Sequence, residues 1–509
     1  MHAQRRRNGE VRLKPDTTRK ADTTRKPDTT GKPDTTKWLK LAALVFGMFA
    51  LSCSGSGGLG SVGCSFGLGS EAPGAGDALV FRNFTLIDGG DHAPVPNAAM
   101  VVEKGRVSWV GPAADLKEPA GATTTDLKGA FVIPGLMNLH AHLGNTVDLV
   151  QDSKFHTRAS IEKDLKTYAS YGVTTVLSMG TDQDTIFPVR NEQRAAFASE
   201  SPAASRPPMA RVYTTGQGLM FKGGYGGLAG VNQPVASPEQ AAAAVNAQLD
   251  KGVDFIKLWL DDELGTMPKM PAEIASAIIE TAHKRNARVL GHIFYLEDAK
   301  FLAGQGIDGF VHSVRDQPID QALIDSMEQH GTWQTAATLS REASMFAYGS
   351  TPPFANDPFF TRGVSAKTLE LIKSPERQKT IASNPNFKKY PAFYETGKAN
   401  FKRLVDAGIP FALGTDAGPP GRFPGYFEHW ELQLMVEAGL TPAQAIDAAT
   451  RRAAMFLGAE DLGTLEPTKW ADFVVLDANP LMDIKNSRKI RAVYIAGSEV
   501  PSINQGGGS

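Results

Sequence analysis

Two histidines that lie two residues apart, His140 and His142, are the first residues of this sequence whose types and spacing could do chemistry. They end the stretch Phe131 to Gly144, FVIPGLMNLHAHLG, which passes through a Pro-Gly turn before its second apolar run. In a β-strand, residues i and i+2 point to the same face, so the two imidazoles would lie side by side. Neutral imidazoles are common metal ligands. Taken alone, the pair fits coincidence as well as it fits a metal site.

Four more polar residues lie at or near the ends of later strand-like segments: Lys257 in VDFIKLWL, His292 in ARVLGHI, His312 in IDGFVHS and Asp416 in IPFALGTD. Each has a structural alternative, because a histidine can be a core residue with backbone partners and an aspartate can form a turn. The lysine is harder to explain in this way, since burial of an unpaired lysine is costly. The six residues together predict a metal centre.

The segments that carry these residues alternate with helical segments between residues 131 and 458. Helices are expected over 158–171, 238–251 and 271–286, and the second opens with Ser237 as N-cap and Pro238 at the first helical position. Eight strands are expected, over residues 131–139, 172–179, 210–216, 253–260, 287–293, 307–313, 332–338 and 409–416. Eight βα units predict an α/β fold, a (β/α)8 TIM barrel with its active site at the carboxyl ends of the strands.

Short strands separated by turns flank this region on both sides. LVFRNFTLID and AMVVEKGRVSWVG lie within residues 77–130, and ADFVVLDANP and KIRAVYIAG lie within residues 459–500. Strands at both ends of a chain, with βα units between them, indicate one small β-sandwich built from both chain ends.

The amino-terminal residues predict export of a bacterial protein. Residues 1–36 contain a six-residue repeat of the KPDTT type without apolar residues, for which we expect disorder. Residues 37–53 combine a basic flank, an apolar run and small residues, as a signal peptide does. The segment ends in a lipobox-like sequence at Cys53, so a periplasmic protein or a membrane-anchored lipoprotein is expected, with cleavage without lipidation as the alternative. Residues 54–76 are a Gly/Ser-rich linker.

Composition excludes several classes of function. The net charge is −1, and the basic residues of the amino-terminal repeat are the only candidate footprint for nucleic acid, so no nucleic-acid partner is expected. The two cysteines, Cys53 and Cys64, precede the predicted catalytic region. This placement excludes thiol catalysis and a cysteine-based zinc site there.

The motifs PGLMNLHAHLG, DFIKLWL, GHIFYLEDAKFLAGQGIDGFVHS and GTDAG, with the tail TPAQAIDAATRRAAMFLGAEDLGTLEPTKWADFVVLDANPL, resemble the metal-dependent amidohydrolase superfamily. The similarity is closest to its imidazolonepropionase-related and prolidase-like branch, and it covers roughly residues 78–500. The resemblance implies two divalent metal ions, with Zn²⁺ the expected metal because imidazoles and carboxylates suit it.

The resemblance also implies a role for each ligand. His140 and His142 would bind the buried metal with Asp416, and His292 and His312 would bind the outer metal. Lys257, carboxylated to a carbamate, would bridge the two ions. A metal-bridging hydroxide would attack the substrate carbonyl, with Asp416 as general base and then general acid. Mononuclear members of the superfamily, among them imidazolonepropionase itself and the deaminases, lack the bridging lysine, so Lys257 argues against them.

Three segments could shape the substrate pocket. The glycine-rich segment Gly216 to Gly230 suggests a mobile active-site loop, with Tyr225 available for substrate contact. Arg315 could hold a substrate carboxylate, and a surface salt bridge is the alternative. Residues 340–398 form an insertion too long for an ordinary barrel connection and rich in aromatic residues, which predicts a lid.

The predicted function is hydrolysis of an amide or peptide C–N bond in a small molecule, such as a dipeptide or an N-acyl amino acid. A lactone, ester or organophosphate could be hydrolysed at the same site. A non-catalytic lipoprotein that binds a ligand is the alternative from another class, and the complete ligand set argues against it. The sequence does not indicate the oligomeric state.

Overall fold

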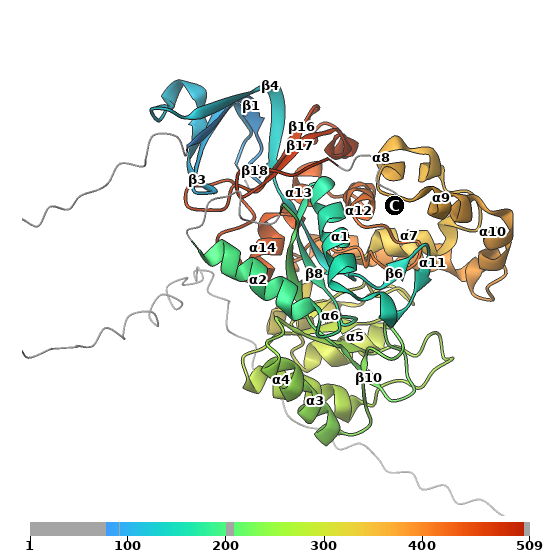
Figure 1. Ribbon diagram of the computed structural model, residues 1–509. Helices are drawn as coiled ribbons and strands as arrows, with labels where there is room; N and C mark the ends of the chain where they lie inside the picture. The colour runs from blue at the N-terminus through green and yellow to red at the C-terminus, as the bar shows by residue number, and fades with distance from the viewer. Residues whose placement is uncertain (1–77, 91, 200–207, 503–509) are drawn as a thin grey trace, which may run out of the picture. The chain divides into compact units, whose positions relative to one another are not determined.

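The computed structural model divides the chain into two compact units, Met1–Ser70 and Glu71–Ser509. It describes residues 78–90, 92–199 and 208–502, all within the second unit (Figure 1). The predicted repeat, signal peptide and linker, with Cys53, lie outside the described residues.

Strands from both chain ends lie in one sheet of seven strands. The amino-terminal part supplies β1 (Leu79–Leu86), β2 (Val95–Glu103), β3 (Arg106–Pro112) and β4 (Thr123–Pro134). The carboxyl-terminal part supplies β16 (Phe473–Leu476), β17 (Ile490–Ile495) and β18 (Ser498–Glu499). The order is β18-β17-β16-β4-β1-β2-β3, with β16 antiparallel to β4. The blue and red strands therefore meet in Figure 1, although most of the chain separates them in sequence.

Nine strands between these ends form two parallel sheets. The first has the order β5-β8-β9, from β5 (Leu136–Ala141), β8 (Val173–Ser178) and β9 (Arg211–Thr214). The second has the order β11-β10-β12-β13-β14-β15. Its strands are β10 (Leu219–Phe221), β11 (Gln233–Val235), β12 (Ile256–Trp259), β13 (Val289–His292), β14 (Gly309–Phe310) and β15 (Trp333–Gln334). The parallel arrangement brings the carboxyl ends of these strands to one side.

Backbone contacts connect the two parallel sheets. On one side, the amide of Asp254, just before β12, donates to the carbonyl of Thr214 in β9 at 2.8 Å. On the other side, residues 411–417 form isolated parallel bridges, Gln334 with Phe411 and Ala141 with Ala417. The predicted strand over 409–416 is wrong, since this segment contributes bridges and no strand among the described residues. Asp416 has φ +58°, a left-handed conformation that interrupts an extended strand.

Helices follow the parallel strands. They include α1 (Arg158–Ser170), α2 (Ile186–Ala198), α3 (Pro238–Asp250), α4 (Ala272–Lys284), α5 (Leu296–Gly304), α6 (Gln321–His330), α12 (Tyr426–Glu437), α13 (Pro442–Ala448) and α14 (Arg451–Leu457). The helices expected over 158–171, 238–251 and 271–286 are confirmed as α1, α3 and α4. The Ser237 side chain accepts from the amide of Gln240, so the predicted N-cap is also confirmed. Apolar residues of α4, such as Ile274 and Ile278, pack in the same core as Ile256 and Val289.

Five helices lie between β15 and residue 411. They are α7 (Leu339–Ala347), α8 (Pro358–Thr361), α9 (Ala366–Lys373), α10 (Pro375–Ala382) and α11 (Tyr390–Asp406). Helices α8, α9 and α10 gather at one side of the unit (Figure 1). Phe354 and Phe360 of this region are buried in a cluster with Tyr426 of α12, so these two aromatic side chains serve ordinary packing. A small hairpin, β6 (Thr146–Val147) with β7 (Val150–Gln151), follows β5.

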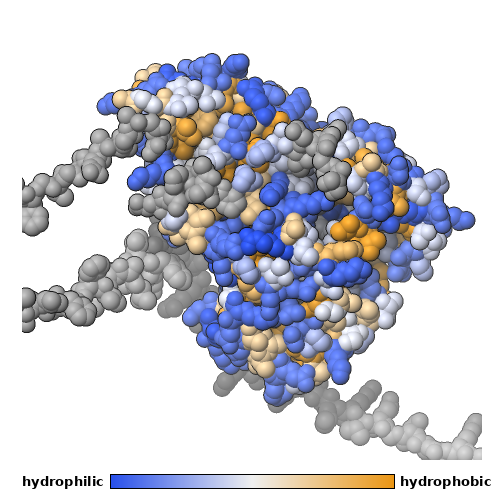
Figure 2. All heavy atoms as spheres, viewed as in Figure 1, coloured by the Kyte–Doolittle hydropathy of each residue, from blue (hydrophilic) through white to orange (hydrophobic). Residues whose placement is uncertain are grey.

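Hydrophobic residues form separate areas among hydrophilic ones on the face shown in Figure 2. Among the described residues, no helix is both long and apolar enough to cross a bilayer.

The turn between β4 and β5 depends on Gly135, and this dependence is testable. A Cβ atom at this position would lie 2.2 Å from Oγ1 of Thr174, so Gly135→Ala should lower the free energy of unfolding by about 1–3 kcal/mol through overpacking. The matched control is Gly304→Ala at the end of α5, where a Cβ would meet nothing within 4 Å. That change should be neutral or stabilising by up to about 1 kcal/mol. Equal effects of the two changes in denaturant titrations would contradict this account.

Candidate metal centre

The six predicted ligand residues occupy the carboxyl ends of the parallel strands or the segments that follow them. His140 lies on β5, Lys257 on β12, and His292 is the last residue of β13. His142 and His312 lie just beyond strand ends, and Asp416 lies in the segment 411–417 that forms isolated bridges. All six residues are buried, and none exceeds 6% relative exposure.

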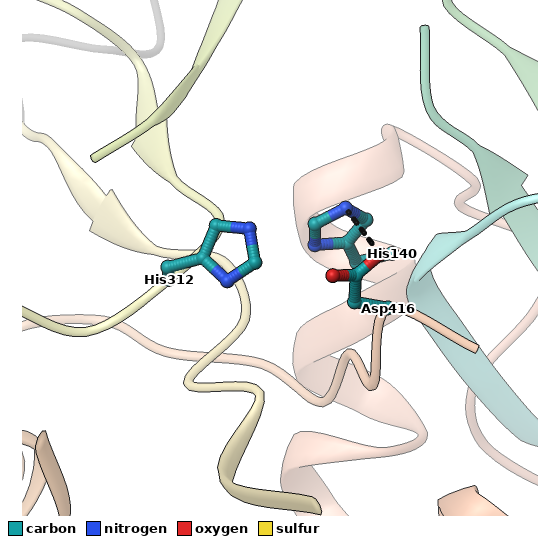
Figure 3. A group of neighbouring side chains, drawn as sticks. All are labelled: His140, His312 and Asp416. Carbon is teal, nitrogen blue, oxygen red and sulfur yellow. Dashed lines mark ion pairs between the residues drawn. The ribbon is translucent and has the colours of Figure 1, made fainter. Parts of the chain in front are cut away.

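Five of these residues line one small cavity, which we call the histidine cavity: His140, His142, His292, His312 and Asp416. Ligand atoms of His140, His312 and Asp416 all lie within 4.8 Å of one another, and these side chains face a common space in Figure 3. Oδ1 of Asp416 is 2.8 Å from Nε2 of His142 and 3.6 Å from Nε2 of His140. The ring centroids of His292 and His312 are 4.2 Å apart. The convergence of donors is what a metal site requires.

Each of three histidines has one ring nitrogen hydrogen-bonded to a group outside the cluster. Nδ1 of His140 donates to the carbonyl of Val311 at 3.1 Å. Nδ1 of His142 is bonded to Oγ1 of Thr181, and Nδ1 of His312 to Oγ1 of Thr338, both at 2.8 Å. Such outer bonds fix the orientation of metal-binding imidazoles and present the other nitrogen to the ion. In all three rings that other nitrogen is Nε2.

His292 is held differently, by a residue that the sequence did not single out. Its Nε2 donates to Oδ2 of Asp261 at 2.8 Å, which leaves Nδ1 as the nitrogen for a ligand. Asp261 lies two residues beyond β12 and is 6% exposed. The signal was present in the sequence, since Asp261 and Asp262 directly follow the strand segment that contains Lys257.

The surroundings of the site favour neutral histidines and an ionised Asp416, which are the forms that bind a metal ion. Burial lowers the pKa of His292 to about 4 and holds the pKa values of His140 and His312 well below their ordinary range. Burial acts against ionisation of Asp416, but Arg422, His140 and His142 outweigh it and hold the pKa of this carboxyl well below its usual value. Neutral imidazoles beside a carboxylate form a donor set suited to a divalent cation.

The sequence of this chain matches the model of the Amidohydrolase family over residues 131–500. The chain belongs to the amidohydrolase family. It is therefore a hydrolase of carbon–nitrogen bonds, and it lies in the imidazolonepropionase-related and prolidase-like branch. The family is metal-dependent, in agreement with the cluster of His140, His312 and Asp416.

Individual relatives cover most of the chain. Imidazolonepropionase of Paracoccus denitrificans is 27% identical over 401 residues, which are 77% of this chain and 90% of that protein. Ochratoxinase of Aspergillus niger is 24% identical over 437 residues, or 80% of this chain and 83% of that protein. The crystal structure of a Xaa-Pro dipeptidase with bound methionine superposes with a TM-score of 0.62 at 21% identity, over 83% of this chain and 99% of that one.

The amine of Lys257 in this amidohydrolase is buried, and its Nζ lies 5.3 Å from the centroid of the Trp259 ring. The lysine is 1% exposed, and its Nζ has no hydrogen bond among the described residues. Gly180 and Gly218 flank it, because a Cβ at either position would lie 3.0 Å from its Cγ. Burial lowers the pKa of Lys257 to about 7, and the charge of Asp416 opposes this shift. Since a buried polar group without a hydrogen bond is costly, a ligand that supplied one would stabilise this amine.

A buried polar network holds two of the ligand-bearing segments together. Oδ1 of Asn138 accepts from the amides of His140 and Thr415, at 2.8 and 3.2 Å. Its Nδ2 donates to Oγ1 of Thr415 and to Oε1 of Glu428 on α12. Asn138 thereby fixes the backbone beside His140 and beside Asp416.

Arginines that the sequence did not identify lie close to Asp416. Arg422 forms an ion pair with Oδ2 of Asp416, and Nε of Arg341 lies 3.6 Å from the same atom. Arg422 also lines the histidine cavity, whereas Arg315 does not.

Arg315 itself is 2% exposed and pairs with the buried Glu342 at 3.2 Å, so a surface salt bridge is wrong for it. Its Nη1 donates to the carbonyls of Ile293 and Ser313. Nothing in these contacts supports binding of a substrate carboxylate by Arg315, and that role stays a prediction.

Tyr225 lies where it could contact a substrate. Its ring lines the histidine cavity, and its centroid is 5.1 Å from that of His292. The surrounding glycine-rich segment contains β10, which is hydrogen-bonded in the six-stranded sheet. A Cβ at Gly218 would lie 2.3 Å from the ring of Trp259. Close packing therefore explains at least this glycine without mobility of the loop.

The missing hydrogen bond of the Lys257 amine predicts an unusual stability effect. In buffer free of carbon dioxide and divalent metals, Lys257→Met should raise the free energy of unfolding by on the order of 1–3 kcal/mol, because an apolar side chain of similar length replaces a buried amine without a hydrogen bond. Denaturant titration measures this change. The matched control, Lys222→Met at an exposed position, should change stability by less than about 0.5 kcal/mol. Destabilisation by Lys257→Met would mean that the amine has a stabilising partner.

Proposed function

We propose that this amidohydrolase cleaves an amide or peptide bond of a small molecule, of the dipeptide or N-acyl amino acid type, at a centre that holds two divalent ions. The observation that carries the proposal is the buried Nζ of Lys257, which makes no hydrogen bond among the described residues and lies close enough to Asp416 for their charges to interact. The proposed ligands are His140, His142, Lys257, His292, His312 and Asp416.

Lys257 can serve as a metal ligand only after its amine has been converted to a carbamate. An ammonium group cannot bind a cation, whereas a carbamate offers two anionic oxygens that can bridge two ions. The pKa of about 7 gives a substantial fraction of free amine at neutral pH, and the free amine is the form that reacts with carbon dioxide. An imidazolonepropionase is among the relatives, but a bridging lysine favours a two-ion site over a one-ion site.

The chain's own residues would orient the substrate and move protons. When bound, the metal ions would lower the pKa of a water molecule and polarise the scissile carbonyl. Asp416 would accept the proton from the attacking water and deliver it to the leaving nitrogen. Oδ1 of Asp416 already contacts His142 while Oδ2 contacts Arg422, so Arg422 is placed to stabilise the ionised form of this base. Tyr225 would contact the substrate from the side of His292.

Several structural features belong to the same proposal. We infer that a (β/α)8 barrel is closed by eight segments, supported by the contacts that residues 411–417 make with β15 and β5. The eight segments are β5, β8, β9, β12, β13, β14, β15 and residues 411–417. We also infer that the seven-stranded sheet acts as a separate small domain beside it. Zn²⁺ is the proposed metal, and the names of the ochratoxinase and the Xaa-Pro dipeptidase support an amide substrate. Export as a periplasmic protein or lipoprotein rests on residues 37–53 alone.

Metal content provides the first test. Protein purified with Zn²⁺ and bicarbonate should contain about two metal ions per chain, and Lys257→Ala should contain one or fewer. Lys222→Met should keep the wild-type content. A short carboxylate such as formate, added to Lys257→Ala, should restore part of the second ion by supplying the missing oxygens. One ion per chain in the wild type, unchanged in Lys257→Ala, would rule out the two-ion centre.

A substrate panel provides the second test. The Zn²⁺-loaded protein should hydrolyse dipeptides or N-acyl amino acids faster than matched esters, lactones or organophosphates. Asp416→Asn should lower kcat by about 10²–10⁴-fold, because the amide cannot accept the proton. Asp325→Asn, a change of the same kind at an exposed position on α6, should leave kcat unaltered. Faster turnover of esters would mean that the enzyme cleaves an ester bond and not an amide bond. Absence of turnover on the whole panel would contradict the amide proposal.

A further inference from the structure

A second cavity, which we call the lid cavity, lies beside the histidine cavity. Its walls come from α7, α10, the start of α11 and the loop after Asp416. Arg422 lines both cavities, so the two hollows are neighbours on either side of this one side chain.

The two cavities differ in volume, and only the lid cavity is large enough for the bulk of a substrate. The histidine cavity encloses about 30 Å³, enough for one or two water-sized groups. The lid cavity encloses about 270 Å³, near the lower end of ligand pockets, at roughly 300 Å³. A substrate with its scissile carbonyl at the histidines must therefore place its larger part elsewhere, and the lid cavity offers the space next to Arg422.

The wall of the lid cavity carries two basic side chains, of which Arg422 is already paired with Asp416. Arg377 and Arg422 both line it, and no aspartate or glutamate is among the described residues of its wall. Nε of Arg377 is buried without a hydrogen-bond partner. Burial raises the pKa of the Tyr348 hydroxyl, and the charges of both arginines oppose that shift, so both guanidinium groups lie near this hydroxyl. The wall therefore has unused capacity to bind an anion.

A third cavity is also lined by Arg422, and its charged residues differ from those of the lid cavity. Asp148 and Asp164 line it, together with Lys163. A carboxylate next to Arg422 would meet these two acids on that side, whereas it meets Arg377 on the lid side. Electrostatics therefore direct an anionic group into the lid cavity.

We propose that the lid cavity is a subsite for the part of the substrate that carries two carboxylates, an acidic amino acid such as glutamate on the leaving side of the scissile amide. Arg422 would bind the carboxylate nearer the scissile bond, and Arg377 would bind the side-chain carboxylate. Tyr348 and Tyr390 would pack along the carbon chain between them. This inference rests on the proposed amide hydrolysis and narrows its substrate class to C-terminal acidic residues.

The first experiment compares a dipeptide ending in glutamate with the matched dipeptide ending in glutamine on the Zn²⁺-loaded protein. The wild type should prefer glutamate by at least about tenfold in kcat/KM, because a charge-assisted bond to Arg377 is lost with glutamine. Arg377→Met should bring the ratio close to one, mainly through KM, and Arg377→Lys should retain part of the preference. Lys379→Met removes a charge from an exposed position on the same helix and should leave the ratio unchanged.

A binding measurement separates this inference from the proposed catalysis. Calorimetry of glutamate and glutamine with the same loaded protein should show tighter binding of glutamate, abolished in Arg377→Met and kept in Lys379→Met. Such binding without hydrolysis of any amide would support the acidic subsite and overturn the proposed reaction. Hydrolysis of amides with equal rates for glutamate and glutamine would overturn the subsite alone. A glutamate preference that survives Arg377→Met would also overturn it.

Discussion

The rest of the site depends on one buried carboxylate. This carboxylate belongs to Asp416, and it lies among neutral imidazoles. Burial acts to raise the pKa of this carboxyl, and Arg422, His140 and His142 outweigh burial and hold the pKa well below its usual value. The backbone contributes as well, because Asp416 is held at φ +58°, and such strain persists only where surrounding contacts determine it. Asn138 provides some of these contacts, since it links the backbone beside Asp416 to β5 and to α12.

Much of the fold could be predicted because hydrophobic periodicity and helix caps are local signals. The helices α1, α3 and α4 and the strands β8, β12 and β13 fall within the expected segments. The segment 409–416 was expected to be a strand because it is apolar, and in the structure it forms only isolated bridges with β15 and β5. The left-handed conformation of Asp416 at its end is not contained in any local pattern of the sequence.

The residues of the candidate site also fall into those that the sequence could identify and those that it could not. Histidines at strand ends could be found from the sequence, since the carboxyl ends of parallel strands meet in any such fold. Arg422 and Arg341 could not, because their positions depend on the path of loops and of the helical insertion. Arg315, three positions after His312, pairs with Glu342 and is not among the residues that line the histidine cavity, so its predicted role stays untested. Spacing in sequence locates residues on regular elements, whereas side-chain partners decide the role of residues in loops.

The seven-stranded sheet has a consequence for how the chain is made. β4 leaves the ribosome well before its partner β16, which begins more than 300 residues later in the chain. At about 5–20 residues per second, the edge of β4 that β16 will cover stays unpaired for tens of seconds. An exposed strand edge of this kind can pair with another nascent chain. Chaperone occupancy of the early intermediate, and aggregation of chains that end before β16, would follow from this topology and not from the chemistry of the site.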